Sequence, residues 1–245
     1  MNINITYIGH SGFLAELNTC YFLFDYYKGT IPNLDPDKML IVFVSHGHPD
    51  HFNPEIFGLY EKHPRIMYLI SSDIKIDDRN MDKYGITDLY NKITIVNADS
   101  KYEISDGKCS MTVSTLKSTD EGVAFLIEYM DKIIYHAGDL NLWVWKEEDK
   151  QYNNNMKARF EKELLKIKGL NIDVAFAPLD PRQEEWYGLG LDALLDNVNI
   201  KYVFPMHFWS KPEVVTMYKK ERESKPTTAV IMDVKKQGQS WSISI

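Results

Sequence analysis

One short segment, Ser45-His46-Gly47-His48-Pro49-Asp50-His51, constrains this chain more than any other feature of its sequence. It places three of the seven histidines of the chain, together with one aspartate, within six consecutive positions. Imidazole suits Zn²⁺ and related metals, and a carboxylate adds a hard anionic ligand. A polar loop that carries histidines by chance is the alternative, but clustering of this density favours a metal site.

The residues on both sides of this segment define its structural context. The apolar run Met39–Val44 predicts a buried strand that ends just before it. Asn53-Pro54-Glu55 predicts the start of a helix, with asparagine as the N-cap and proline at the first helical position. Gly47 allows the backbone to turn sharply, so both flanking histidine rings can be directed at one point.

Alternating and continuous apolar patterns predict further strands and helices along the chain. Strands are expected at Ile3–Tyr7, Phe13–Leu17, Cys20–Asp25, Ile66–Ile70, Ile93–Val96, Ser110–Leu116, Val123–Tyr129, Lys132–Tyr135, Ile172–Ala177 and Lys201–Phe204, followed by two near the C-terminus. Helices are expected at Leu189–Val198, at Glu213–Glu223, and between Lys146 and Lys168, the last either unbroken or interrupted near Asn153–Asn155. No repeat or long linker divides the chain, so we expect a single α/β domain over residues 1–245.

The overall composition narrows the classes of function. The formal net charge of −7 and the scattered lysines predict no basic face, which argues against binding a nucleic acid or an anionic membrane. Cys20 and Cys109 show neither metal-binding nor disulfide spacing, as is typical of proteins in a reducing compartment. No basic region followed by an apolar stretch opens the sequence. We therefore expect a cytoplasmic protein whose partner is a small-molecule substrate.

The histidine segment also resembles a known family signature. Its pattern, H-x-H-x-D-H after a buried strand and before a helix, is similar to that of the metallo-β-lactamase superfamily. Ile134–Asp139 resembles the family's strand that ends in Gly-Asp, and Phe204–His207 resembles its late strand with a terminal histidine. Gly9–Gly12 resembles the branch that contains ascorbate-6-phosphate lactonases and uncharacterised hydrolases. The resemblance implies a four-layer αββα sandwich, in which two mixed β-sheets face each other with helices outside.

The same resemblance implies a set of metal ligands. His46 and His48 would hold a first metal ion, Asp50, His51 and His207 a second, and Asp139 would lie between the two. The expected cofactor is zinc, as one or two ions, with iron or manganese as alternatives. Two such cations can share a hydroxide nucleophile and stabilise the charge that develops when a carbonyl or phosphoryl group is attacked. Asp50 is the predicted catalytic residue, because it can both bind metal and orient that water.

One part of the sequence departs from the family pattern. The first metal of the family normally has a third histidine between His51 and Asp139, but the matching segment, Leu116–Gly122, contains none. Asp120 is the favoured substitute ligand, ahead of Ser118 or Thr119. Lys117 is a second candidate, as a positive charge in place of a metal or as a contact to the substrate. The third alternative is a weak first site, which would leave one metal ion or none.

Several other residues have two interpretations that the sequence leaves open. His136 either faces the site or packs beside it, and His10 either lies at the rim of the site or is a hydrogen-bonded turn residue. The aromatic residues that follow the predicted ligand segments either line a substrate pocket or belong to the core. These residues are Trp143, Trp145, Trp186, Phe208 and Trp209.

The leading hypothesis for function is a metal-dependent hydrolase that cleaves an ester, lactone, amide or phosphoester of a small molecule. A non-catalytic binding or sensor protein with a degraded metal site is the alternative that the missing histidine supports. A nuclease is disfavoured by the acidic charge balance. A di-iron redox protein is disfavoured as well, because that branch usually has glutamate at the position of His48 and carries an attached flavin domain.

Overall fold

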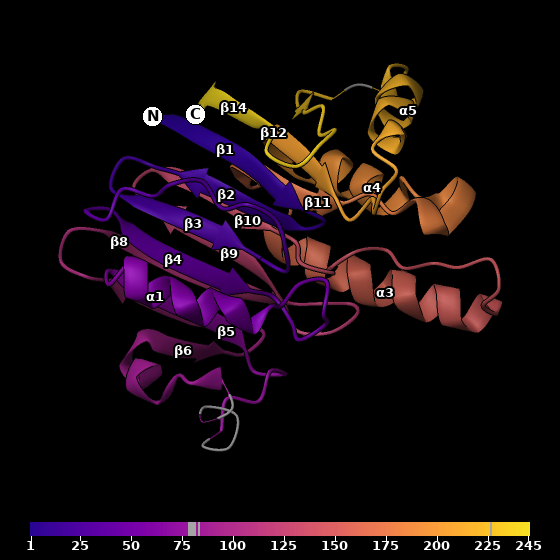
Figure 1. Cartoon of the computed structure of the whole chain (residues 1–245). Helices are drawn as coiled ribbons and strands as arrows, with labels where there is room; N and C mark the ends of the chain where they lie inside the picture. The colour runs from indigo at the N-terminus through magenta and orange to yellow at the C-terminus, as the bar shows by residue number, and fades with distance from the viewer. Residues whose placement is uncertain (78–81, 83, 226) are drawn as a thin grey trace.

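Two β-sheets form the frame of the computed structural model, which describes residues 1–77, 82, 84–225 and 227–245 (Figure 1). The strands of the first sheet are, in spatial order, β14 (Ser240–Ser244), β1 (Asn2–Gly9), β2 (Gly12–Glu16), β3 (Cys20–Phe24), β4 (Met39–Val44), β5 (Ile66–Ser71) and β6 (Ile93–Val96). Those of the second are β13 (Val230–Ile231), β12 (Asn199–Met206), β11 (Asn171–Pro178), β10 (Lys132–His136), β9 (Val123–Tyr129), β8 (Ser110–Lys117) and β7 (Lys101–Ser105).

Both sheets are mixed, and this determines where the loops gather. Strands β3 to β6 pair in parallel in the first sheet, as β10 to β13 do in the second, and the remaining neighbours pair antiparallel. Parallel strands bring their carboxyl ends to one edge of a sheet, where ligands commonly bind. The loops after β3, β4, β10, β11 and β12 are therefore the ones that can build a site.

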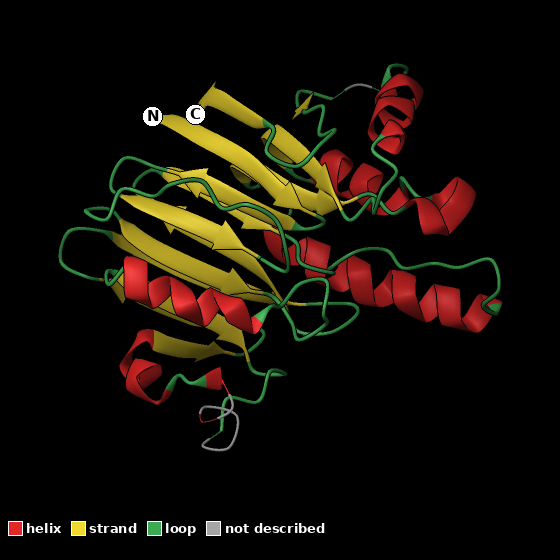
Figure 2. Cartoon of the chain, in the orientation of Figure 1, coloured by secondary structure: helices red, strands yellow, loops and turns green. Residues whose placement is uncertain are grey.

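Helices cover the outer faces of the two sheets, which completes the predicted four-layer αββα sandwich (Figure 2). The first sheet is covered by η1 (Pro54–Gly58), α1 (Leu59–Lys62) and η2 (Thr87–Lys92). The second is covered by α3 (Lys150–Ile167), η3 (Pro181–Trp186), α4 (Leu189–Asn197) and α5 (Glu213–Arg222). Within the described part of the chain, no helix is both long enough and apolar enough to cross a membrane.

Helix α3 is unbroken, which decides between the two forms that the sequence left open. The side chain of Asp149 caps it by accepting a hydrogen bond from the backbone N–H of Tyr152 at 2.7 Å. The Asn153 side chain is occupied outside the helix, because it accepts from the Trp145 backbone N–H and donates to the Trp145 carbonyl. Asn153 therefore fastens the start of the helix to the preceding loop instead of interrupting the helix.

The space between the sheets is filled by buried aromatic rings. Phe24 of β3 stacks on Phe43 of β4 with ring centroids 5.0 Å apart, and Phe13 of β2 meets Phe176 of β11 across the sheets at 4.6 Å. Burial of one such ring contributes about 1.5–3 kcal/mol to stability. Because these rings lie at the ends of strands that carry the loops, they give the site a rigid base.

Candidate metal centre

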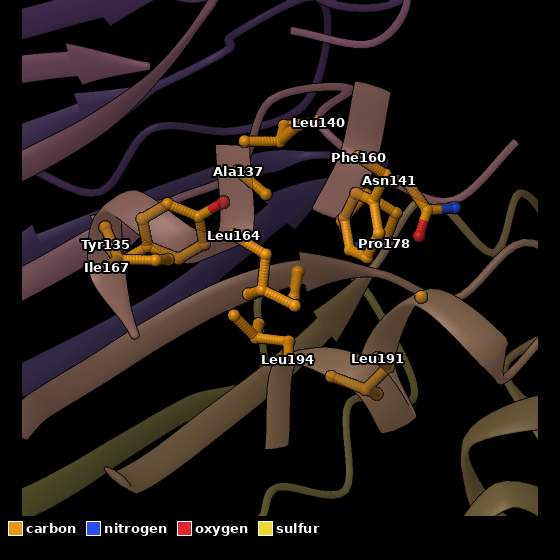
Figure 3. Close-up of a pocket in the computed structure, with 12 residues that line it drawn as sticks. Tyr135, Ala137, Leu140, Asn141, Phe160, Leu164, Ile167, Pro178, Leu191 and Leu194 are labelled. Atoms are coloured by element: carbon orange, nitrogen blue, oxygen red, sulfur yellow. The ribbon is translucent and has the colours of Figure 1, made fainter. Parts of the chain in front are cut away.

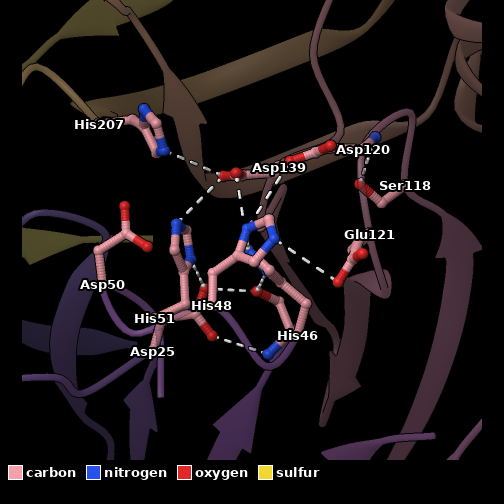
Figure 4. A network of polar contacts seen from close by, with 12 residues as sticks. Asp25, His46, His48, Asp50, His51, Ser118, Asp120, Glu121, Asp139 and His207 are labelled. Atoms are coloured by element: carbon pink, nitrogen blue, oxygen red, sulfur yellow. Dashed lines mark hydrogen bonds and ion pairs between the residues drawn. The ribbon is translucent and has the colours of Figure 1, made fainter. Parts of the chain in front are cut away.

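The predicted ligands come together where the parallel strands of both sheets end (Figure 4). His46, His48, Asp50 and His51 follow β4, Asp139 follows β10, and His207 follows β12. They form two groups, in each of which one ligand atom per residue lies within 4.8 Å of all the others. The first group is His46, His48 and Asp139, and the second is His10, Asp50, His51 and His207.

Asp139 lies between the two groups and is close to both. Its Oδ1 is 3.2 Å from His51 Nε2 and 3.3 Å from His207 Nε2, while its Oδ2 is 3.7 Å from His46 Nε2. Burial raises the pKa of this carboxyl group, but the histidines around it outweigh burial and hold its pKa well below the ordinary value. An ionised carboxylate that reaches two sets of imidazoles has the position of a bridging ligand.

A test of whether these residues fit a metal ion comes from their unsatisfied atoms. Buried polar atoms normally have hydrogen-bond partners, and leaving one without a partner costs about 1–3 kcal/mol. Among the described residues, His10 Nε2, His51 Nε2 and Asp139 Oδ1 are buried without such a partner. These atoms have lone pairs that a divalent cation would occupy, so the residues present fit the metal that the sequence predicts.

Three of the histidines share one arrangement, in which Nδ1 is fastened and Nε2 is directed at Asp139. His46 Nδ1 lies 3.0 Å from Ser45 Oγ, and His51 Nδ1 donates to Asp25 Oδ2 at 2.8 Å. His207 Nδ1 donates to Asp180 Oδ2 at 2.9 Å. Hydrogen bonds of this kind fix the tautomer and orientation of metal-binding histidines.

Asp25, which the sequence analysis did not single out, organises the loop of the first group. It is fully buried, and its carboxylate accepts hydrogen bonds from the backbone N–H of Ser45 at 2.8 Å and from Ser45 Oγ at 2.6 Å. Burial raises the pKa of Asp25, but the charges of His136 and His51 and the hydrogen bond from His51 lower it below the ordinary value. Its position directly after an apolar strand is the signal that could have identified it.

Asp180, also missed from the sequence, has the corresponding role at His207. Its side chain is fully buried at the end of β11 and caps η3 by accepting from the backbone N–H of Arg182. Burial raises its pKa, but hydrogen bonds from His207 and Arg182 lower the pKa to about 2. The carboxylate is therefore charged, and it connects a candidate metal ligand to an arginine.

Backbone strain is concentrated at this edge of the sheets. Seven non-glycine residues have positive φ in the described part of the chain, and four of them belong to the site: His10, Asp25, His207 and Trp209. Such residues persist only where the surrounding structure holds them, and they cluster at functional sites.

Two histidines whose roles the sequence left open are now assigned. His10 is part of the second group, with its Nε2 3.2 Å from Asp50 Oδ2 and its ring centroid 4.2 Å from that of His207. His136 instead packs beside the site, stacked on Phe24. Its Nε2 donates to the Ser11 carbonyl and its Nδ1 accepts from the Gly138 N–H, so both ring nitrogens are used.

The segment that lacks the third histidine lies beside His48. Asp120 Oδ2 is 3.8 Å from His48 Nδ1, and this nitrogen is also 3.0 Å from His46 Nε2. Glu121 Oε2 lies on the other side of the His48 ring, 3.6 Å from Nε2. Ser118 is buried and its Oγ accepts from the Asp120 N–H, and Thr119 Oγ1 is bonded to the Asn141 carbonyl. Lys117 is exposed at the end of β8.

The protonation of the histidines differs across the site. Burial lowers the pKa of His207, but the opposite effect of Asp139 and Asp180 is larger and raises the pKa to about 10. Burial and the charge of His51 lower the pKa of His46 to about 4. His46 is thus neutral at pH 7, while His207 must lose a proton before it can bind a metal.

Two clefts open beside the metal groups. The first, called here the Asp139 cleft, has a volume of about 440 Å³, and its walls include Asp139, Asp120, Trp143, Trp145 and Arg182. The second, the His10 cleft, has a volume of about 610 Å³, and its walls include His10, Trp209, Lys28, Lys235 and Lys236. Trp143, Trp145, Phe208 and Trp209 thus line clefts, whereas Trp186 packs against the core.

A third space lies away from the site, between α3, α4 and the second sheet (Figure 3). Apolar side chains such as Phe160, Leu164 and Leu191 line it, and its volume is only about 10 Å³. A gap of that size holds one water at most, and an apolar one has few polar partners for it. It is a packing defect of the core.

Comparison with known proteins agrees with the fold and the site. A family model described as the β-lactamase superfamily domain matches residues 4–207. The chain belongs to this superfamily. A protein of Opitutus terrae, named a metal-dependent hydrolase, is 27% identical over 227 residues, which cover 86% of this chain and 87% of the relative. One of Exiguobacterium, also named a metal-dependent hydrolase, is 24% identical over 228 residues, covering 86% and 88%.

A solved structure extends the superfamily match to the whole fold. The metallo hydrolase Igni18 from Ignicoccus hospitalis superimposes with a TM-score of 0.66 at 17% identity and covers 100% of both chains. The superfamily match and the group of ligands that can hold a metal confirm the prediction of an enzyme of the metal-dependent hydrolase type.

Proposed function

We propose that this chain uses two metal sites to cleave an ester, lactone, amide or phosphoester bond of a small molecule bound in the Asp139 cleft. The observation that carries the proposal is the position of the Asp139 carboxylate, which borders the cleft and lies within 3.7 Å of His46, His51 and His207. His46 and His48 would hold one ion, and Asp50, His51 and His207 the other, with Asp139 between them and His10 as an additional ligand of the second ion.

The residues of the chain prepare the site for a hydrolytic reaction. When bound, divalent ions lower the pKa of water and act as Lewis acids toward a carbonyl or phosphoryl oxygen. Asp25 and Asp180 keep protons on the Nδ1 atoms of His51 and His207, so that Nε2 of each ring is the atom that loses its proton when a metal ion binds there. Asp50 is ionised and partly exposed, and its free oxygen can accept a proton from an attacking water.

Asp120 is proposed to supply the oxygen ligand that replaces the third histidine. Its carboxylate is on the side of His48 Nδ1, the nitrogen closest to His46 Nε2, and it is partly exposed at the cleft. Glu121 lies against the opposite nitrogen of the same ring, where it can orient His48. Zinc suits this mixture of imidazole and carboxylate ligands, with iron or manganese as alternatives.

A non-catalytic sensor with a degraded site is the second candidate. A closed pocket would favour that function, because a sensor needs no path for a substrate. The open volume of about 440 Å³ beside Asp139 favours catalysis instead. The acidic residues Asp120 and Glu121 on its wall also weigh against a nucleic-acid substrate.

Metal content and hydrolysis together test the proposal. Protein purified without added metal or chelator should contain about two equivalents of metal per chain by elemental analysis. It should hydrolyse at least one member of a panel of p-nitrophenyl esters, lactones and phosphodiesters, and Asp139→Asn should abolish that activity. A protein that binds metal but hydrolyses no member of the panel would support the sensor function.

A further inference from the structure

Arg182 stands out among the residues of the Asp139 cleft, because its position is fixed from several directions. Its Nε lies 3.0 and 2.9 Å from the two carboxylate oxygens of Asp180, and its Nη2 lies 2.6 Å from Oδ2. The guanidinium also lies over the ring of Trp209, with Cζ 4.8 Å from the ring centroid, and 5.9 Å from that of Trp145. The flexible side chain of Arg182 is therefore held in one orientation before any ligand binds.

The same side chain keeps hydrogen-bonding capacity for another molecule. A guanidinium has five N–H donors, and the bonds to Asp180 use only Nε and Nη2. Among the described residues, Arg182 forms no hydrogen bond through Nη1. The side chain is 49% exposed although its partner Asp180 is fully buried, and it borders the same cleft as Asp139. An arginine that served only to neutralise Asp180 would not need to face this cleft.

We propose that Arg182 is a substrate-binding residue that holds a carboxylate or phosphate group of the substrate in the Asp139 cleft. This inference rests on the proposed hydrolytic function and adds the chemical class of its substrate, a small molecule with an anionic end. Arginine suits this task because its planar fork forms paired hydrogen bonds with carboxylate and phosphate oxygens.

The distribution of charge in the cleft agrees with an anionic group of the substrate at Arg182. The carboxylates of Asp120 and Glu121 lie within 4 Å of His48, so these two negative charges are at the His48 end, away from Arg182. A second arginine, Arg159 of α3, lines the cleft and donates from Nη2 to the Thr119 carbonyl at 2.7 Å. Burial lowers the pKa of Arg182, but its hydrogen bonds to Asp180 and the charge of Asp180 raise the pKa above the ordinary value, with smaller contributions from Asp139 and Asp50. Arg182 and Asp139 line the same cleft. A substrate bound by Arg182 would therefore extend toward Asp139.

The His10 cleft offers a competing location for an anion. Lys28, Lys235 and Lys236 border it, but all three are exposed, and among the described residues none has a buried carboxylate partner comparable to Asp180. The experiment must therefore separate the two clefts. Lys236→Gln removes a charge from the His10 cleft, and Lys146→Gln removes one from an exposed lysine that borders neither cleft.

The first measurement is calorimetric titration of the metal-loaded protein with inorganic phosphate and, separately, with glutarate. The metal content of each variant is determined first, so that a lost ion is not mistaken for a lost anion site. Arg182→Gln should weaken binding of at least one anion roughly 10- to 100-fold, the value of a charge-assisted hydrogen bond. Arg182→Lys should recover only part of that affinity, because it restores the charge without the fork. Lys146→Gln should bind as the wild type does.

The two anions distinguish phosphate from carboxylate substrates, and the variants decide the location. If neither anion binds the wild-type protein, or if Lys236→Gln weakens binding while Arg182→Gln does not, the inference is wrong. Loss of binding in Arg182→Gln at full metal content supports it.

A pair of esters separates this inference from the function on which it rests. The wild-type enzyme should prefer mono-p-nitrophenyl glutarate over the neutral p-nitrophenyl butyrate, and Arg182→Gln should reduce that preference. Anion binding through Arg182 in a protein that hydrolyses neither these two esters nor any member of the panel of esters, lactones and phosphodiesters would refute the hydrolase and leave the anion site. Hydrolysis with the same preference in both proteins would refute the anion site and leave the hydrolase.

Discussion

Asp25 accepts a hydrogen bond from His51 at 2.8 Å, and the side chains of both residues are completely shielded from solvent. The carboxylate stays ionised in this position because it also accepts two hydrogen bonds from Ser45 and because charges on the surrounding histidines lower its pKa. One buried charge therefore holds the loop of the first ligand group and one ligand of the second group.

Replacement of Asp25 should weaken metal binding without removing a ligand. We expect Asp25→Asn to lower metal affinity roughly 10- to 100-fold, since the amide no longer fixes the tautomer of His51. Competition with a chromophoric chelator measures this affinity. Asp131→Asn is the matched control, because Asp131 is 82% exposed and lies before β10, at the opposite end of that strand from Asp139. Equal affinities in the two variants would show that Asp25 does not orient His51.

Asp120 can be tested against its neighbour Glu121. If Asp120 replaces the missing histidine, Asp120→Asn should reduce the metal content toward one equivalent per chain, because the first ion would keep only His46, His48 and Asp139. Glu121→Gln should retain both equivalents, since Glu121 lies against the other nitrogen of His48. Elemental analysis after dialysis gives the result. Two equivalents in both variants would exclude Asp120 as an essential ligand.

The metal-free protein should lose stability as the pH rises. In the folded protein the pKa of His207 is about 10, compared with an ordinary value of 6.5. A raised folded-state pKa means that protonation stabilises the fold, so this contribution is complete below pH 6.5 and is lost as the pH rises through about 10. Urea unfolding in the presence of a chelator should therefore give a free energy of unfolding that falls across this window. The fall should be smaller in His207→Gln, and identical slopes would contradict the assignment.

Gly122 should be indispensable for the geometry of the first ligand group. Its φ is +68°, and a Cβ there would collide with the Ser45 carbonyl oxygen and lie 2.7 Å from His46 Cβ. We expect Gly122→Ala to lower the free energy of unfolding by at least about 3 kcal/mol. Gly107 also has positive φ but nothing within 4 Å of its Cβ position, so Gly107→Ala should cost only about 1 kcal/mol. Similar losses in both variants, measured by urea unfolding, would mean that the contact with Ser45 is unimportant.

The sequence predicted the strands best where the apolar pattern was strong. Met39–Val44, Ile93–Val96 and Val123–Tyr129 have the predicted bounds, and α3 begins close to where the charge pattern changes. The strand Lys101–Ser105 was missed because it is an edge strand of five residues with a single buried side chain, so its alternation of Tyr102 and Ile104 with polar residues is short. An edge strand buries fewer side chains than a central strand, so its apolar pattern in the sequence is weaker.

The candidate site divides in the same way. The residues His46 to His51 are close together in the sequence as well as in space, so their grouping could be predicted from the residues themselves. Asp139 and His207 were predicted only through the resemblance to the superfamily. Asp25 and Asp180 were missed because a single carboxylate after a strand is common, and only the fold brings each one to a histidine. Arg182 was missed for the same reason, since its partners Trp145 and Trp209 lie far from it in the chain.

The carboxylate of Asp180 holds two side chains at once, because His207 and Arg182 both donate a hydrogen bond to its Oδ2. A substitution at Asp180 that moved the arginine would also disturb the histidine, so the proposed anion site and the proposed metal ligand are coupled through this residue. Divergence toward new substrates would proceed more freely at Tyr152 and Arg159, which border the same cleft and are not hydrogen-bonded to a candidate metal ligand among the described residues. Laboratory evolution that spares Asp180 and randomises those two positions should therefore keep a larger share of metal-loaded variants.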